Sequence, residues 1–203
     1  MPTARPYWLV LAVPLAAFLA LTVWANLDLT KHHTFLYNDE QMVYWNIRPI
    51  LQPSGVSQFL WQVADAGDHR YGRLFFNATA LVAWLPSLFA GEAGLIFAER
   101  MAQVLFLGAA YVLFVLAVLR TWPGRFLALT LLLALPANGY FAVMPKPEAL
   151  LLLCLAAFAW FHRRADLAWG KHWALLGAAF GCKISALPFV FVFFLHAAWE
   201  TFK

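Results

Sequence analysis

The stretch Leu36-Tyr-Asn-Asp-Glu-Gln-Met-Val-Tyr-Trp45 places two carboxylates directly after the first long apolar run of the chain. Asn38 is suited to cap a helix. Asp39 and Glu40 then fall in the first turn, where the helix dipole favours negative charge. Pro49 limits the helix, because it lacks an amide donor and disfavours helical geometry in the residue before it. We therefore expect a short helix with two carboxylates at its entrance.

The side chains of this helix predict where it lies. Val43, Ile47 and Ile50 form one apolar edge. Tyr44 and Trp45 suit the depth of the lipid headgroups, so the helix is expected to lie on a membrane surface. Carboxylates in a first turn are also common as plain partners of the helix dipole, and the residues alone leave both roles open.

The composition predicts an integral membrane protein. Of 203 residues, 64% are hydrophobic and 12% are charged, whereas soluble domains average about 45–50% apolar and about 25% charged residues. The net charge of +4 is scattered between apolar runs, which argues against nucleic acid as a partner. Cys154 and Cys182 lie in apolar segments and are expected to be buried thiols. No cluster has metal-ligand spacing, so no cofactor is indicated, although a divalent metal is left open.

The apolar runs predict an all-α bundle of about six membrane segments. A span takes about 20 mostly apolar residues, and an open strand edge cannot be satisfied in lipid. The runs cover residues 7–25, 74–90, 101–119, 126–137, 149–161 and 173–195. Residues 26–72 are the long polar interval, expected to be an extracytoplasmic loop with short juxtamembrane helices. The chain, 1–203, is thus expected to form a single transmembrane module.

Basic residues between the runs predict the orientation. With the N-terminus inside, strict alternation puts the basic groups of residues 120–125 and 163–171 outside, against the positive-inside tendency. If the segment near 74–98 does not cross fully, those groups move inside. We favour this second arrangement, which brings to the side of the acidic loop the residues Arg100, Lys146 and Glu148.

Charged residues in or beside apolar runs are candidate ligands. A basic residue near the bilayer centre costs about 2.5–3.5 kcal/mol, so it tends to line a cavity or find a partner. Lys183 lies within the last run and indicates anion binding or carboxylate pairing, or else a lysine that snorkels to the interface. Arg100 opens a run, as an anion ligand or an ordinary interfacial arginine would. Lys146 and Glu148 fit either substrate contacts or a plain loop.

A second charged motif, Asp68-His-Arg-Tyr-Gly-Arg-Leu-Phe-Phe76, lies directly before the second run. A basic residue here can reach a lipid phosphate, and Asp68 can orient it or contact a hydroxylated substrate. The alternative is a juxtamembrane cluster that only sets the topology.

The order of these motifs resembles that of the polytopic GT-C glycosyltransferases, particularly the bacterial branch related to protein O-mannosyltransferases and aminoarabinose transferases. The resemblance covers essentially all of this chain but only the N-terminal half or less of such an enzyme, so a longer enzyme is expected. The features that carry it are the Asp-Glu pair after the first span, the motif at Asp68, a Gly-Glu turn at Gly91, Arg100, the turn Lys146-Pro-Glu-Ala-Leu-Leu, and a Gly-x-Lys that ends at Lys183.

The resemblance implies a multipass enzyme of the bacterial inner membrane. It would transfer a hexosyl or pentosyl group from a polyprenyl-phosphate carrier to an extracytoplasmic acceptor. Asp39, with Glu40 beside it, would take the proton from the acceptor hydroxyl. The cationic partners of the leaving lipid phosphate would be His69, Arg70, Arg100 and Lys183. The substrate contacts would be Asp68, Lys146 and Glu148.

The chain departs from the family pattern at two points. Many relatives have a Pro-Pro pair and often a lysine before the second span, whereas this chain has Tyr71-Gly-Arg73, so the phosphate ligand is not assigned by the motif. Glu148 stands where relatives commonly have aspartate. Two other functions stay open: a non-catalytic membrane subunit that packs against a larger complex, and a transporter or lipid flippase, which Lys183 and the interrupted segments favour.

Overall fold

A computed structural model of the chain describes residues 8–30, 38–64, 71–164, 169–183 and 186–201. The described residues are all-helical and contain no strand, as the composition predicted. The helices are α1 (Trp8–Thr30), α2 (Asn38–Leu51), α3 (Val56–Ala64), α4 (Arg73–Val118), α5 (Trp122–Leu133), α6 (Pro136–Val143), α7 (Pro147–Arg164), α8 (Trp169–Cys182) and α9 (Leu187–Thr201).

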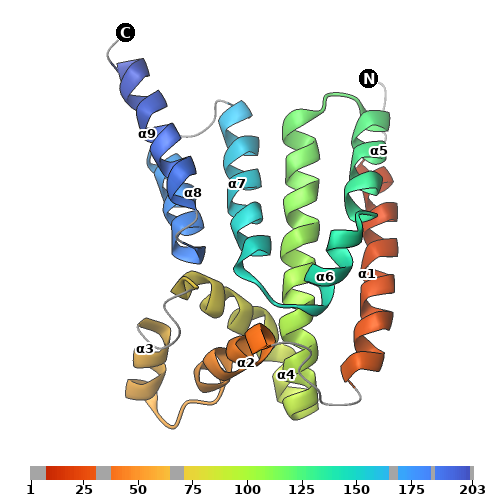
Figure 1. Cartoon of the computed structure of the whole chain (residues 1–203), viewed down its shortest axis with the longest axis vertical. Coiled ribbons are helices and arrows are strands. Elements are labelled where there is room, and N and C mark those ends of the chain that lie inside the picture. The colour runs from red at the N-terminus through yellow and green to blue at the C-terminus, as the bar shows by residue number, and fades with distance from the viewer. Residues whose placement is uncertain (1–7, 31–37, 65–70, 165–168, 184–185, 202–203) are drawn as a thin grey trace, which may run out of the picture.

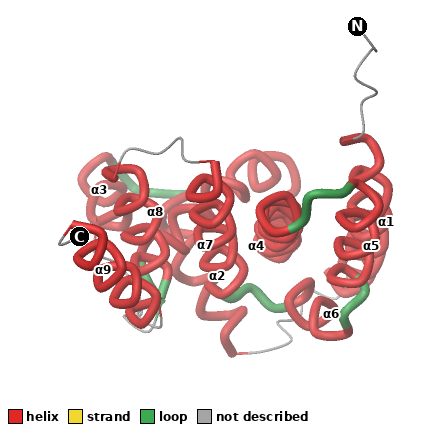
Figure 2. The backbone as a smooth tube through the Cα atoms, turned by 90° about the horizontal axis from the view of Figure 1, so that it is seen from above, coloured by secondary structure: helices red, strands yellow, loops and turns green. Residues whose placement is uncertain are grey.

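The long helices run along one axis. In Figure 1, α1, the second part of α4, α5, α7, α8 and α9 lie roughly along the vertical direction, and both chain ends are at the top. Seen from above, α4 stands between α1 and α5 on one side and α7, α8 and α9 on the other (Figure 2). Helices α2 and α3 lie across the opposite end from the chain ends.

Two described helices are long and apolar enough to cross a membrane, Leu9–Leu27 in α1 and Gly91–Val118 in α4. This number is smaller than the about six membrane segments that the sequence predicted. The other apolar helices are shorter, because proline and glycine residues interrupt the apolar runs. Those that meet the apolar criterion over 10–17 residues are Arg73–Phe89, Trp122–Leu133 and His172–Cys182. The α1 segment has only 22% of its apolar window buried, so most of its apolar surface is exposed.

Helix α4 breaks at Gly91, which has φ 57° and ψ −138°. This backbone region is open to glycine and costly for other residues. Residues 74–90, expected to be the second membrane segment, instead lie across the end of the bundle beside α2 and α3 (Figure 1). Arg73 Nε and Asn77 Nδ2 both donate to the carbonyl oxygen of Val63 in α3, at 3.3 and 3.1 Å. The first part of α4 therefore packs against α2 and α3.

The last apolar run, residues 173–195, was expected to be one interrupted segment and is instead two helices. α8 and α9 lie side by side in opposite directions (Figure 1). The rings of His172 and Phe193 are stacked with centroids 5.7 Å apart, and Trp173 meets Phe193 edge-on at 5.2 Å. Lys183 therefore lies at the end of α8, between two antiparallel helices, and not in the middle of a span.

The start of α4 meets the end of α8 backbone to backbone. The amide of Gly72 donates to the carbonyl oxygen of Cys182 at 2.8 Å. A Cβ atom on Gly72 would overlap the carbonyl group of Gly181. The absence of a side chain at Gly72 therefore lets α8 end against the layer formed by α2, α3 and the first part of α4.

Helix α2 has the predicted apolar edge and one misassigned residue. Val43, Ile47 and Ile50 are buried in a core cluster with side chains of α4, α7 and α8. Tyr44, expected at headgroup depth, is buried as well, while Trp45 is exposed. The helix also runs past Pro49 to Leu51, because the missing amide costs a bond only in the last turn.

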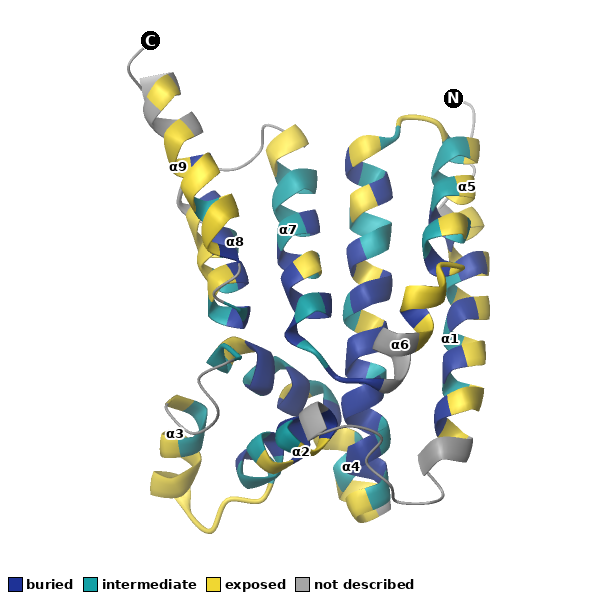
Figure 3. Cartoon of the chain, in the orientation of Figure 1, coloured by how far each residue is buried: buried dark blue, intermediate teal, exposed yellow. Residues whose placement is uncertain are grey.

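The outer faces of the long helices are apolar and exposed (Figure 3). In α9 the exposed large side chains include Phe189, Phe191, Val192, Phe194 and Leu195. Contiguous exposed apolar surface of this kind marks contact with lipid or with another protein.

Candidate functional site

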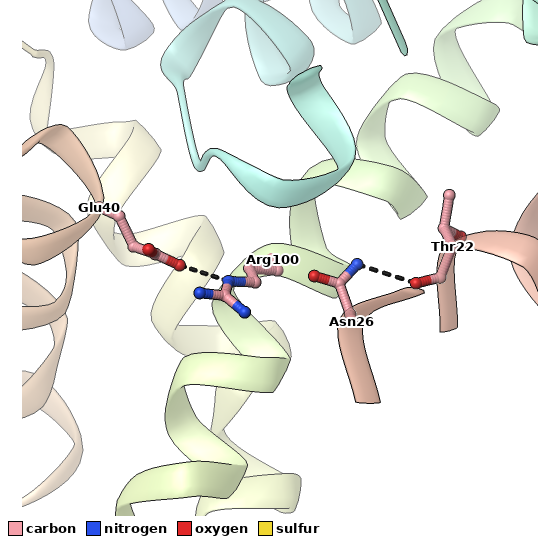
Figure 4. Close-up of polar contacts among 4 residues, drawn as sticks. All are labelled: Thr22, Asn26, Glu40 and Arg100. Carbon is pink, nitrogen blue, oxygen red and sulfur yellow. Dashed lines mark hydrogen bonds and ion pairs between the residues drawn. The ribbon is translucent and has the colours of Figure 1, made fainter. Parts of the chain in front are cut away.

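The most deeply buried charges join α2 to α4. Arg100 Nε donates to Glu40 Oε1, and both side chains have 0% exposure. Figure 4 shows Arg100 reaching from α4 towards Glu40 on α2. A buried pair of this kind is stable only when both partners are present. The pair therefore holds the first turn of α2, which contains Asp39, against the start of the second part of α4.

A third ionisable side chain, that of Glu99, adjoins this pair. Its side chain is fully buried, and its carboxylate oxygens have no hydrogen-bond partner among the described residues. It lies close enough to experience the charges of Glu40 and Arg100. Glu99 was not among the predicted site residues, although an acidic residue next to an arginine at the start of an apolar run was the available signal.

Helix α1 adds polar groups on the other side of Arg100 (Figure 4). Asn26 Nδ2 donates to the carbonyl oxygen of Thr22 at 2.9 Å, and Thr22 Oγ1 donates to the carbonyl oxygen of Phe18 at 2.9 Å. Thr22 and Asn26 are both buried. Polar side chains from α1, α2 and α4 thus meet at the end of the bundle that carries α2.

A second ion pair joins α7 to the end of α8. Lys183 Nζ donates to Glu148 Oε1, with side-chain exposures of 27% and 31%. The ammonium group also lies 5.8 Å from the centroid of the Tyr71 ring, directly before α4. Of the roles considered for Lys183, carboxylate pairing is the one seen. Lys146, two residues before Glu148, is half-buried in the turn that leads into α7.

A third group of contacts ties α2 to the residue after the break in α4. The Tyr44 hydroxyl donates to Glu92 Oε1, and Arg48 Nη1 lies 3.7 Å from the same oxygen. Burial and the hydrogen bond to Glu92 raise the pKa of Tyr44 to about 12. The phenol is therefore neutral at ordinary pH and acts as a hydrogen-bond donor.

The other predicted site residues are only partly located. Asp39 lies in the first turn of α2, but its side chain is outside the described residues, as are Asp68, His69 and Arg70. Arg100 and Lys183 are each paired with a carboxylate. The convergence of Asp39 with the cations on one cavity stays a prediction. No group of three His, Cys, Asp or Glu side chains suited to a metal ion gathers among the described residues.

An apolar groove of about 410 Å³ lies at this end of the bundle, between α2, α3 and the first part of α4. Its walls include Ile50, Phe59, Val63 and Trp84, and Asn77 is its polar side chain. Such a groove is suited to an apolar chain rather than to a sugar.

Comparison of the chain with protein-family models, with curated proteins and with solved structures found no match. The function is therefore inferred from the residues and their geometry.

Proposed function

We propose that the chain is a multipass membrane protein. Its segments would be α1, α4 from Gly91 onwards, α5 together with α6, α7, α8 and α9. Their common direction and their exposed apolar faces support this (Figures 1 and 3). Helices α8 and α9 are shorter than a full span of about 20 residues, and the break between them would lie at the membrane surface.

The distribution of basic residues supports one orientation. Arg120 and Arg125 lie at the turn between α4 and α5, and Arg163 lies at the end of α7, all at the end of the bundle away from α2. Basic residues favour the cytoplasmic side. The end that carries Glu40 and Arg100 would then be extracytoplasmic, in the plasma membrane of a bacterium.

The activity that we propose is transfer of a hexosyl or pentosyl group from a polyprenyl-phosphate carrier. The observation that carries the proposal is the buried Glu40–Arg100 pair, which holds the first turn of α2 and therefore Asp39 at the extracytoplasmic end of α4. Asp39 would accept the proton of the acceptor hydroxyl while the oxygen of that hydroxyl bonds to the anomeric carbon of the sugar. The bond from that carbon to the phosphate oxygen breaks, and the polyprenyl phosphate leaves with the electron pair.

The roles of the charged residues divide accordingly. Glu40 is a positioning residue, because its carboxylate is taken by Arg100. Arg100 and Lys183 already have carboxylate partners, so the leaving phosphate is assigned chiefly to His69 and Arg70. The apolar groove at the same end of the bundle supports a carrier with an apolar chain.

The test is turnover of defined donors by the chain in lipid nanodiscs. A panel of polyprenyl-phosphate hexoses and pentoses is mixed with bacterial membrane extract as the acceptor source, and release of free polyprenyl phosphate is measured by mass spectrometry. Asp39→Asn should lower the release at least about 100-fold, since a positioned general base contributes about 10²–10⁴-fold. The matched control is Gln41→Asn, an exposed neighbour on the same helix, which should retain activity. Equal activity of Asp39→Asn and wild type would exclude the proposed base.

A second candidate is a non-catalytic membrane subunit. The specific observation in its favour is that Arg100 and Lys183 are both neutralised by carboxylates, as structural ion pairs are. Absence of release by the wild-type chain with every donor, together with a stable co-purifying membrane protein, would favour this candidate over the transferase.

A further inference from the structure

Three arginines gather at the end of the bundle opposite to α2. Arg120 lies between α4 and α5, Arg125 lies in the first turn of α5, and Arg163 lies near the end of α7. They line one cavity of about 350 Å³ together with Trp122 and Trp160. Residues from separate segments thus converge on one cationic site, which the proposed transferase activity does not use.

Two of the arginines are fixed by backbone groups. Arg125 Nε donates to the carbonyl oxygen of Leu119 at 2.9 Å, and its guanidinium lies 4.6 Å from the centroid of the Trp122 ring. Arg163 Nη1 donates to the carbonyl oxygen of Ala117. Each contact takes one donor group, and a guanidinium has five N–H bonds. The remaining donors are held in place and stay available to a ligand.

The cluster has no compensating negative charge among the described residues. None of the three arginines is in an ion pair there, and Arg120 is in no hydrogen bond either. The last carbonyl groups of α4 account for the positions of Arg125 and Arg163, but they do not account for Arg120. Uncompensated guanidinium groups beside indole rings are suited to an anion that arginine forks can bind, above all a phosphate.

A separate apolar groove adjoins the arginine cavity. It has a volume of about 340 Å³ and shares Leu119 with that cavity. Its walls come from Phe114 and Val118 of α4, from Leu131 of α5 and from Leu135, the residue before α6. The groove is therefore lined by apolar side chains of α4, of α5 and of the residue before α6, close to the arginine cavity. A soluble phosphate needs no such groove, whereas an acyl chain does.

We propose that Arg120, Arg125 and Arg163 bind the phosphate of an anionic phospholipid, whose acyl chain lies in the groove between α4 and α5. Basic pockets between helices on the cytoplasmic side of a membrane bind anionic headgroups, and tryptophan is enriched at this depth. The proposal rests on the membrane orientation given above and is independent of the transferase activity.

The experiment is native mass spectrometry of the full chain in detergent with three added probes: dioleoyl-phosphatidylglycerol, dioleoyl-phosphatidylcholine and glycerol 3-phosphate. We expect retained adducts with phosphatidylglycerol, weaker ones with phosphatidylcholine, and none with glycerol 3-phosphate. Equal binding of the two lipids would overturn the role of the arginines. Equal binding of glycerol 3-phosphate and phosphatidylglycerol would overturn the lipid and leave a site for free phosphate.

Variants locate the site. In Arg120→Gln/Arg125→Gln/Arg163→Gln, affinity for phosphatidylglycerol should fall between about tenfold and about a hundredfold, because three basic contacts are lost. The matched control is Arg48→Gln, an arginine at the other end of the bundle, which should bind as the wild type does. Equal losses in the triple variant and in this control would overturn the proposal.

A measurement on the wild type covers the case in which the triple variant does not fold. Phosphatidylglycerol with a photoreactive acyl chain is cross-linked to the chain in vesicles, and the modified peptides are mapped. We expect labels in residues 114–119 and 128–135, which line the groove. Labels confined to other segments would overturn the site.

Discussion

The two ends of the bundle differ in how their basic side chains are paired with acidic ones. At the end that carries α2, Arg48, Arg100 and Lys183 each lie within 4.0 Å of a glutamate oxygen. At the other end, Arg120, Arg125 and Arg163 have no acidic partner among the described residues. Positive charge at the first end is therefore part of the internal structure, while at the second end it has no carboxylate partner among the described residues.

The same contrast appears in burial. The pair of Glu40 and Arg100 is fully enclosed by helices, whereas Arg120 and Arg163 are exposed. A buried charge that loses its partner is costly, and an exposed one is not. Substitutions at the α2 end should therefore lower the free energy of unfolding, whereas substitutions at the other end should mainly change the binding of lipid.

The largest effect is expected at Arg100. Arg100→Leu leaves the carboxylate of Glu40 buried without its cation, beside the second buried acid Glu99, and should lower the free energy of unfolding by about 3–5 kcal/mol. Unfolding in mixed micelles, followed by tryptophan fluorescence, measures this. The double variant Glu40→Leu/Arg100→Leu should recover much of the loss. A double variant as unstable as the single one would show that the pair is not the cause.

An intermediate effect is expected at Lys183. Its pair with Glu148 is about one-third exposed, so Lys183→Met should cost about 1–2 kcal/mol in the same unfolding assay, between the values for surface and buried pairs. Arg48→Met, which breaks the more exposed pair with Glu92, is the control and should cost less than about 1 kcal/mol. A reversed order would contradict the dependence on burial.

A smaller effect, confined to alkaline pH, is expected at Tyr44. Its pKa in the folded protein is about 12, above the ordinary value of 10.0. The unfolded chain therefore loses this proton first, so the contribution to stability is complete below pH 10 and is lost as the pH rises towards 12. Stability is measured against pH for wild type and Tyr44→Phe. The difference between the two curves should be flat below pH 10, and a change near neutral pH would refute the assignment.

The smallest effect is expected at Arg120. In detergent without phospholipid, Arg120→Gln should change the free energy of unfolding by no more than about 0.5 kcal/mol, as substitutions at exposed positions usually do. Added phosphatidylglycerol should then stabilise the wild type more than the variant, because a ligand stabilises the state that binds it. A large loss without lipid would mean that this end is also held together by its charges.

The sequence predicted the local features of the fold better than its long-range contacts. The start of α2 at Asn38 and its apolar edge at Val43, Ile47 and Ile50 follow from spacing within a few residues, and both are seen. The pairing of Glu40 with Arg100 spans 60 positions, and no periodicity indicates it. Both residues were predicted as site residues from the sequence, but the ion pair between them was not predicted.

The membrane segments show the same limit. Hydropathy could not separate residues 74–90, which lie across the end of the bundle, from a segment that crosses it, because both are apolar helices. What distinguishes them is tertiary: the contacts of Arg73 and Asn77 with Val63. The reversal between α8 and α9 is likewise a tertiary feature. From the sequence, the interruption near Gly181 indicated only a break in the apolar run.

The break at Gly91 limits the length of the straight helix within α4. A continuous helix of the 46 residues of α4 would be about 69 Å long, more than twice the roughly 30 Å of a bilayer's hydrocarbon core. In the membrane orientation proposed above, the turn at Gly91 would place the first part of α4 along the surface and leave 28 residues, Gly91–Val118, to cross. In that orientation, one glycine would divide an oversized helix into a segment of membrane-spanning length and a surface helix on which α2 and α3 pack.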